Sequence, residues 1–185
     1  MADEIDYSFL SELEGGSKTT GYVPATDVSK SGVTIATGFD LGQRNETDLS
    51  NLGLSADLLK TLKPYLGKKA KDAQAELDKK PLSIKDEEAE EIDKAVKKSH
   101  IDMLKLKYDA AAENKKKFTD LPAEAQTVIA SVSFQYGTNL STRAPKFWGA
   151  AKKQGWKECA AILKSFGDAY PTRRKKEASL LEKIK

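Results

Sequence analysis

The chain has 185 residues, of which 39% are hydrophobic and 32% are charged, and its net charge is +3. This composition is typical of a soluble globular protein with a sizeable core, and it excludes a disordered chain. No apolar run approaches the roughly 20 residues that a membrane-spanning helix needs. We therefore expect one folded domain over residues 1–185 that does not insert into a membrane.

A single cysteine, Cys159, and a single histidine, His100, limit the chemistry. An internal disulfide is excluded, because it needs two cysteines. A zinc site with several His or Cys ligands is nearly excluded, and a Ser-His-Asp triad would have to use His100. Cys159 lies on the apolar side of a predicted helix, where we expect it to pack in the core. We expect neither a metal nor a cofactor, so carboxylates would have to carry any proton transfer.

The charges are unevenly distributed along the chain. Residues 1–50 hold nine acidic and three basic residues, whereas residues 115–185 hold fifteen basic and six acidic ones. An acidic front and a basic rear suit a cleft with carboxylates on one wall and anion-holding groups on the other. The simpler interpretation, that most lysines only solvate the surface, stays open.

The first 42 residues predict a helix followed by a small β-hairpin. Apolar residues at helical spacing over 5–13 indicate a helix, which should end at Gly15 because glycine is favoured just past a helix end. Residues 22–23 and 33–37 are predicted strands, joined by a polar loop rich in turn residues. Gly38 then breaks the strand pattern.

The rest of the chain is predicted to be helical. Ser55 could cap a helix that is interrupted near Pro64, and Ser83 with Asp86 resembles a capping box. Further helices are expected over residues 68–79, 84–113, 122–136, 145–165 and 171–183.

Three residues around the predicted hairpin could perform acid–base chemistry. Glu14 lies at the C-terminal turn of the first helix, whose partial negative charge disfavours a second anion. Thr34 on the strand could orient a water molecule, and Asp40 follows on a turn where backbone N–H groups are available. The spacing alone also permits an exposed Glu14, a Thr34 that only favours the strand, and an Asp40 that only caps a helix.

Residues at both ends of the chain resemble the phage-type lysozymes, and most closely the pesticin-like muramidase toxins. The front carries Leu13-Glu14-Gly15 and then GVTIATGFDLG over 32–42. Residues 133–137, 147–160 and 170–174 are similar to the rear lobe of T-even phage lysozymes in order and approximate spacing. Residues 45–115 are similar only in being helical.

The resemblance implies a mostly helical α+β, lysozyme-like fold with two lobes. It places a front lobe with a small N-terminal β-hairpin or sheet at about 15–80 and a connecting helix at about 84–113. A helical rear lobe at about 118–185 is joined by the first helix.

The resemblance also implies a peptidoglycan hydrolase that cleaves the β-1,4 bond between N-acetylmuramic acid and N-acetylglucosamine. Glu14 matches the general acid, Thr34 the threonine that positions water, and Asp40 the aspartate of pesticin-like enzymes. In T-even phage lysozymes the aspartate instead precedes the threonine, roughly where Asp27 lies in this chain. We favour Asp40, because glycines fix its turn whereas Asp27 lies in a loose loop.

Two further positions match the family and one departs from it. The resemblance also implies that Gln135 and Arg173 bind substrate: Gln135 matches a residue that lines the cleft, and Arg173 matches an arginine that pairs with the catalytic glutamate. Ala36 stands where the family usually has glycine, which adds a methyl group near the cleft floor. The separation of the two carboxyl groups would decide between inversion, at roughly 6.5–9.5 Å, and retention, at about 5–5.5 Å; a water-holding threonine favours inversion.

Two other functions stay open. A lytic transglycosylase would need one glutamate and no second carboxylate. A basic helical module could bind nucleic acid or another polyanion through residues 115–185, although no recognisable DNA-binding pattern is present, so no nucleic-acid partner is expected.

The expected partner is a peptidoglycan strand, bound by a monomer, and a toxin would also have an immunity protein. The start, MADEIDYSFL, lacks the features of a secretory signal. We therefore expect action in the periplasm or cell wall after delivery by a non-Sec route, by lysis, or by a separate targeting domain. The sequence fits a phage lysin, a bacteriocin or an effector equally well.

Overall fold

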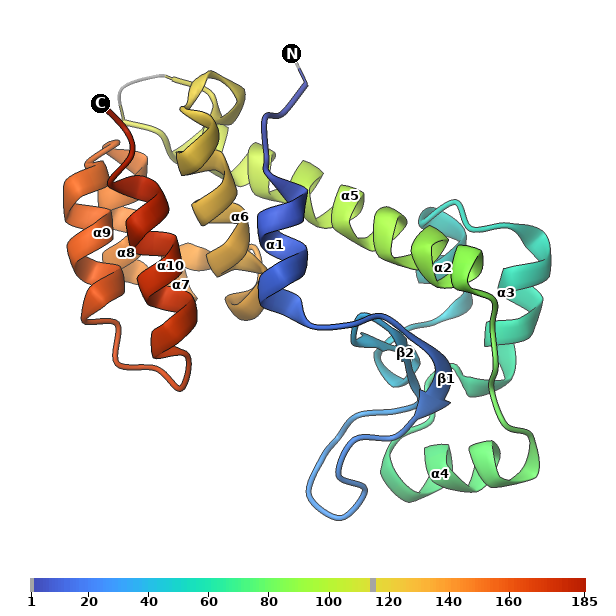
Figure 1. The fold of residues 1–185 in the computed structure, drawn as a ribbon. Helices are drawn as coiled ribbons and strands as arrows, with labels where there is room; N and C mark the ends of the chain where they lie inside the picture. Colours follow the sequence, from blue (N-terminus) through green and yellow to red (C-terminus); the bar gives the residue numbers. More distant parts are fainter. Residues whose placement is uncertain (1, 114–115) are drawn as a thin grey trace. The chain divides into compact units, whose positions relative to one another are not determined.

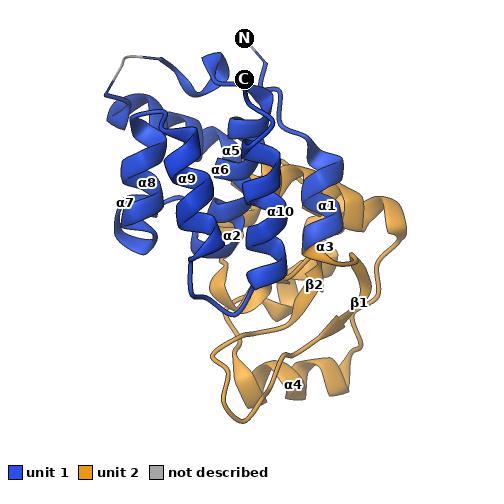
Figure 2. Cartoon of the chain, turned by 60° about the vertical axis from the view of Figure 1, so that its left-hand side comes forward, with its two compact units in different colours: residues 1–13, 100–185 blue, residues 14–99 orange. Residues whose placement is uncertain are grey.

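The computed structural model describes residues 2–113 and 116–185, which form two compact units. Unit 1 is made of residues 1–13 and 100–185, and unit 2 of residues 14–99 (Figure 2). Each unit has its own hydrophobic core. The fold is the mostly helical, lysozyme-like α+β class that the sequence predicts. That the units form a single domain, with lobes at the expected boundaries, stays a prediction.

Unit 2 contains the small antiparallel sheet (Figure 1). Its strands are β1 (Lys18–Tyr22), β2 (Thr34–Ala36) and β3 (Phe39–Asp40), in the order β1-β2-β3. The sequence predicts the second strand well and places the first a few residues late. It misses β3, because a two-residue strand after a glycine turn has no periodicity to detect.

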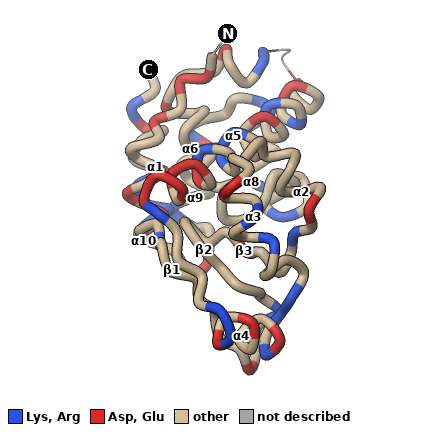
Figure 3. Tube along the Cα trace, turned by 90° about the vertical axis from the view of Figure 1, so that its right-hand side faces the viewer, with Lys and Arg blue, Asp and Glu red and all other residues tan. Residues whose placement is uncertain are grey.

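The helices of unit 2 pack on this sheet around one core. They are α2 (Glu46–Asn51), α3 (Ala56–Leu62), α4 (Ala70–Lys79) and the first part of α5 (Asp86–Ala111), with 3-10 turns at Leu41–Gln43 and Lys63–Tyr65. The core contains residues of β2, α3 and α5, including Ile35, Leu58 and Ile92. Charges of both signs occur along α4 (Figure 3), which buries only Ala73 and Leu77, as a surface helix should.

Two local predictions about helix boundaries have different outcomes. The predicted interruption near Pro64 is confirmed, since α3 ends and a 3-10 turn follows. The predicted capping box of Ser83 is wrong. Ser83 instead forms an isolated β-bridge with Thr20, and Lys85 donates its backbone N–H to Glu88 at 3.1 Å ahead of α5.

All the regular elements in the described part of unit 1 are helices. It contains α1 (Tyr7–Glu14, whose last residue belongs to unit 2), the second part of α5, α6 (Ala123–Tyr136), α7 (Leu140–Arg143), α8 (Pro145–Lys152), α9 (Trp156–Lys164) and α10 (Pro171–Leu181), with a 3-10 turn at Phe118–Asp120. Nine consecutive residues of α6, 125–133, are buried, so α6 runs through the core of this unit. Cys159 is fully buried, as expected.

The single helix expected over 145–165 is in fact two helices. The helical conformation is interrupted between α8 and α9 at Gln154, which adopts a φ of 60° and is followed by Gly155. A left-handed residue ends an α-helix, and here that residue is Gln154 and not the glycine that follows it. Across the described residues, no helix has the length and apolar character required to cross a membrane.

Candidate active site

Thr34 and Asp40 lie opposite each other on adjacent strands. They are Cα partners in the antiparallel register of β2 and β3, so their side chains project from the same face of the sheet. Both side chains bond to the same residue: the Thr34 hydroxyl donates to the carbonyl oxygen of Gly32 at 3.2 Å, and the Gly32 N–H donates to Asp40 Oδ1 at 2.8 Å. The structure therefore brings these two predicted site residues together.

The Asp40 carboxylate connects two backbone segments through a single oxygen. Its Oδ1 also accepts the N–H of Gly42 at 2.9 Å, which caps the 3-10 turn that follows. Among the described residues, Oδ2 has no such bond, so it can still accept a proton or a water molecule. The predicted N-cap role is thus real, and it leaves one carboxylate oxygen for chemistry.

Glycine is required at both ends of this connection. A Cβ on Gly32 would lie 2.3 Å from the carbonyl oxygen of Lys68 and 2.4 Å from Gly42 Cα, and a Cβ on Gly42 would lie 2.6 Å from Gly32 Cα. Gly32 and Gly42 let two backbone segments approach each other closely, which places Asp40 beside Thr34.

Ala36 adopts the left-handed conformation, with a φ of 52°, and is buried. An L-residue is strained there, whereas glycine is not. The departure from the family noted at this position therefore costs backbone energy as well as adding a methyl group.

Asp27, the alternative second carboxylate, lies exposed in the loop between β1 and β2. It is part of a turn that begins at Ala25 (φ 42°) and exposes 88% of Val28. Nothing in this loop resembles the double N–H anchor of Asp40, which supports the preference for Asp40.

Glu14 is the last residue of α1, as the sequence predicts, and Gly15 follows with a φ of 78°. Its side chain is only 13% exposed, and its Oε2 lies 3.4 Å from Lys97 Nζ on α5. The sequence gives no hint of this partner. Lys97 reads as one more charged residue on a helix rich in them.

One turn earlier on α5, Asp93 contacts both segments of the candidate site. Its Oδ1 accepts the backbone N–H of Thr37 at 2.9 Å. Its Oδ2 accepts the hydroxyls of Thr37, at 2.9 Å, and Ser17, at 2.8 Å. Thr37 lies between Thr34 and Asp40, and Ser17 follows Glu14 by three residues, so α5 links the two parts of unit 2 that carry the predicted catalytic residues.

Arg173 and Gln135, the predicted substrate-binding residues, belong to a polar network inside unit 1. Arg173 donates to the carbonyl of Ser131 at 2.9 Å, to that of Leu13 at 3.4 Å, and to Glu177 Oε1 at 3.2 Å. It therefore holds the C-terminal turn of α1 just before the predicted acid. Its pairing with Glu14 stays a prediction.

The centre of this network is Glu177, which is fully buried. It bonds to both Arg173 and Arg174 and accepts the hydroxyl of Ser131. Arg174 also donates to Asp168 at 3.0 Å and to the Gln135 amide oxygen. Burial alone would lower the pKa of Arg174, but the anionic Glu177 and Asp168 raise it overall.

His100 and Cys159 are structural residues. His100 stacks on Phe134, and its Nε2 lies 2.9 Å from the Ser133 hydroxyl, whose own proton goes to the Ala130 carbonyl. Burial, and then the charge of Lys107, lowers the pKa of His100 to about 4. Burial also raises the pKa of the Cys159 thiol to about 12, so neither residue is poised as a base or nucleophile.

No group of three or more His, Cys, Asp or Glu in the described part of the chain could hold a metal ion. The arrangement in unit 2 instead provides a carboxyl group beside an ammonium at Glu14 and a hydroxyl beside a carboxylate at Thr34 and Asp40. Such groups can donate a proton, orient a water molecule and accept a proton from it.

A comparison with models of known protein families identifies a related family. A protein-family model described as "Pesticin: Bacterial toxin homologue of phage lysozyme, C-term" matches residues 4–157, which include α1, the whole of unit 2 and most of the unit 1 helices. No curated protein sequence matches the chain.

Proposed function

Because this chain belongs to the Pesticin family, the bacterial toxin homologues of phage lysozyme, we propose that it cleaves the β-1,4 bond between N-acetylmuramic acid and N-acetylglucosamine. Membership of the family indicates a lysozyme-like hydrolase that acts on peptidoglycan in the cell wall. The bond, the mechanism and the roles of individual residues are our proposal.

In this mechanism Glu14 protonates the leaving glycosidic oxygen while the bond from that oxygen to C1 of the muramic acid breaks. Thr34 holds a water molecule, whose oxygen forms the new bond to C1 on the opposite face of the sugar. Asp40 Oδ2 takes the proton that this water loses. The products are two shorter glycan strands, and the configuration at C1 is inverted.

The structure of the Thr34–Asp40 pair is the observation that carries the proposal. The Thr34 hydroxyl donates a hydrogen bond to the carbonyl oxygen of Gly32. The lone pairs of the hydroxyl oxygen therefore remain available to accept a hydrogen bond from water. Asp40 uses one oxygen for its backbone anchors and keeps the other. A water between the two side chains would be oriented by the hydroxyl and activated by the carboxylate.

Lys97 holds the Glu14 side chain in place. Its Nζ lies 3.4 Å from Glu14 Oε2, in a site where the Glu14 and Lys97 side chains are 13% and 23% exposed. A general acid has to direct its carboxyl group at the leaving oxygen, and a fixed partner limits the orientations that this group can adopt.

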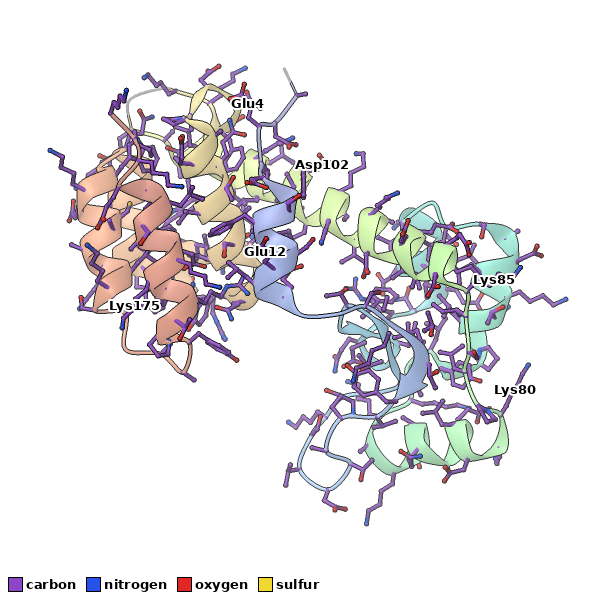
Figure 4. All side chains as sticks on the ribbon, viewed as in Figure 1. Glu4, Glu12, Lys80, Lys85, Asp102 and Lys175 are labelled. Atoms are coloured by element: carbon purple, nitrogen blue, oxygen red, sulfur yellow. The ribbon has the colours of Figure 1, made fainter. Side chains whose placement is uncertain are left out.

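A turbidity assay on purified peptidoglycan tests the proposal. The wild type should clear the suspension, and Glu14→Gln should not, because an amide cannot donate the proton. Glu12→Gln is the matched control on the same helix, since Glu12 (labelled in Figure 4) is exposed and should be dispensable. Clearing by Glu14→Gln at the wild-type rate would exclude Glu14 as the acid.

We also infer an antibacterial role from the family's description as toxin homologues. Fused to a secretion signal and expressed in the periplasm of a Gram-negative host, the wild type should lyse the cells, whereas Glu14→Gln should not. A toxin of this kind would be restrained by an immunity protein, and co-expression of such a partner should prevent lysis. Survival of cells that export an active wild type would contradict the toxin role.

A further inference from the structure

The segment that follows the predicted acid has little packing to hold it. Gly15 and Gly16 separate Glu14 from β1, Gly15 has a φ of 78°, and a Cβ at either glycine would meet nothing within 4 Å. Two adjacent glycines in open space allow the backbone many conformations. Packing at the two glycines therefore does little to fix the chain that leaves Glu14.

Polar contacts with α5 hold this segment on both sides of the glycine pair. Lys97 binds the Glu14 carboxylate, and Asp93 accepts the Ser17 hydroxyl. Asp93 and Lys97 are four residues apart on one helix, so they lie on the same face. A single helix therefore anchors the chain immediately before and immediately after the glycine pair.

The same Asp93 carboxylate holds the turn of the β2–β3 hairpin. It accepts both the backbone N–H and the hydroxyl of Thr37. The next residue, Gly38, has a φ of 70° and open space around it, so Thr37 is the fixed point of that turn. The hairpin carries Thr34 on one strand and Asp40 on the other.

We propose that Asp93 and Lys97 are positioning residues that fix the acid Glu14 relative to the Thr34–Asp40 hairpin. This inference rests on the proposed function, because it assigns how the same site is assembled. Neither residue needs to touch the substrate. Asp93 acts through Ser17 and Thr37, and Lys97 acts through Glu14.

The consequence for catalysis follows from the two flexible glycine segments. Proton transfer and attack by water require reacting atoms to be held in place, and a displacement of about 1 Å can cost about 100-fold in rate. Loss of Asp93 would release both the segment after Glu14 and the hairpin turn. Substrate binding by other parts of the chain would persist, so kcat should fall while KM changes little.

The experiment compares Asp93→Ala, Asp93→Asn and Glu91→Ala. Glu91 is a matched control, since it lies on the same helix and accepts the N–H and hydroxyl of Ser55, at 2.5 Å and 3.3 Å, ahead of α3. Asp93→Ala should lower kcat by about 10- to 100-fold and leave KM within about threefold. Asp93→Asn should recover most of kcat, because its amide oxygen can accept the Thr37 N–H and its amide group can donate to the hydroxyls.

A second pair of variants tests Lys97. Lys97→Met should lower kcat by about tenfold, and Lys97→Arg, which keeps the charge, should restore it. Circular dichroism at the assay temperature checks that every variant is folded. The Thr37 amide resonance in a ¹H–¹⁵N spectrum provides a readout independent of activity: it should shift in Asp93→Ala and stay in place in Glu91→Ala.

The outcomes separate this inference from the proposed function. A wild type that does not cleave peptidoglycan overturns the function, whatever the Thr37 resonance does. An active wild type with a folded Asp93→Ala variant of unchanged kcat overturns the positioning role and leaves the function intact. Equal losses of kcat in Asp93→Ala and Glu91→Ala would also overturn it, since they would report only a general loss of stability.

Discussion

Asp40 has two separable roles, and two substitutions distinguish them. Its Oδ1 holds the N–H groups of Gly32 and Gly42, while Oδ2 is assigned to the reaction. In Asp40→Asn the amide oxygen can still accept both N–H groups, although no basic oxygen remains. Asp40→Ala removes the anchor and the base together.

The expected losses of stability follow from the two hydrogen bonds. A bond to a charged acceptor contributes about 1.5–3 kcal/mol, about twice a neutral one. Asp40 is partly exposed, which favours the lower end of that range. Asp40→Ala should therefore lower the free energy of unfolding by about 3–4 kcal/mol, and Asp40→Asn by about 1–2 kcal/mol.

Both variants should be inactive, so the assay pairs peptidoglycan clearing with urea unfolding followed by circular dichroism. Both tryptophans lie in unit 1, so their fluorescence would miss this change in unit 2. Asp48→Ala is a control: Asp48 accepts the N–H of Asn45 at 2.9 Å in an exposed cap, and its loss should cost about 1 kcal/mol and no activity. Full activity in Asp40→Asn would exclude Asp40 as the base, and a wild-type stability of Asp40→Ala would refute the anchor.

Three other substitutions have defined outcomes. Glu177→Ala leaves the guanidinium groups of Arg173 and Arg174 buried without their shared partner, so urea unfolding followed by tryptophan fluorescence should show a loss of about 3–5 kcal/mol. Ala36→Gly should change the free energy of unfolding by less than about 1 kcal/mol. Relief of the left-handed strain stabilises the variant by about 1–2 kcal/mol. Loss of the buried methyl group costs about 0.8 kcal/mol, and the greater freedom of the unfolded chain costs about 0.4–1 kcal/mol. His100→Gln should weaken the pH dependence of stability, because the native pKa of about 4 lies below that of the unfolded histidine. As the pH falls from about 6.5 to about 4, the unfolded state takes up a proton that the native state does not. The free energy of unfolding should therefore fall by about 1–2 kcal/mol more in the wild type than in the variant. The full pKa difference corresponds to about 3 kcal/mol, which is reduced here because the ring is partly exposed.

Each of these has a contradicting result. A Glu177→Ala variant that unfolds at the wild-type urea concentration would mean that the two arginines reach water or other acceptors. A clear destabilisation by Ala36→Gly would show that the buried methyl outweighs the strain. Parallel stability curves for the wild type and His100→Gln between pH 7 and pH 4 would place the His100 ring in solvent.

The sequence predicts the parts of this molecule that depend on local patterns. The end of the first helix at Gly15 and the strand through Thr34 follow from glycine preference and β-branched residues. The resemblance to lysozymes supplied the roles of Glu14, Thr34 and Asp40, and the register places the last two side by side.

The contacts that hold these residues were not predictable from the sequence, because they join distant segments. Asp93 and Lys97 are separated from Glu14 by about 80 residues, and on a helix with many acids and lysines their spacing is typical of a solvated surface. The close approach of Gly32 to Gly42 likewise depends on the carbonyl of Lys68. Only the folded chain shows which of many charged residues has a partner at the site.

The ends of the cleaved glycan provide the sharpest test of the proposed chemistry. Peptidoglycan digested by the wild type and analysed by mass spectrometry should carry reducing N-acetylmuramic acid ends, each heavier by one water than the corresponding 1,6-anhydro form. Digests with Glu14→Gln should show neither. Anhydro ends would identify a transglycosylase that uses no second carboxylate. Reducing N-acetylglucosamine ends would identify cleavage of the other glycosidic bond. Either result would contradict a muramidase that uses Glu14, Thr34 and Asp40.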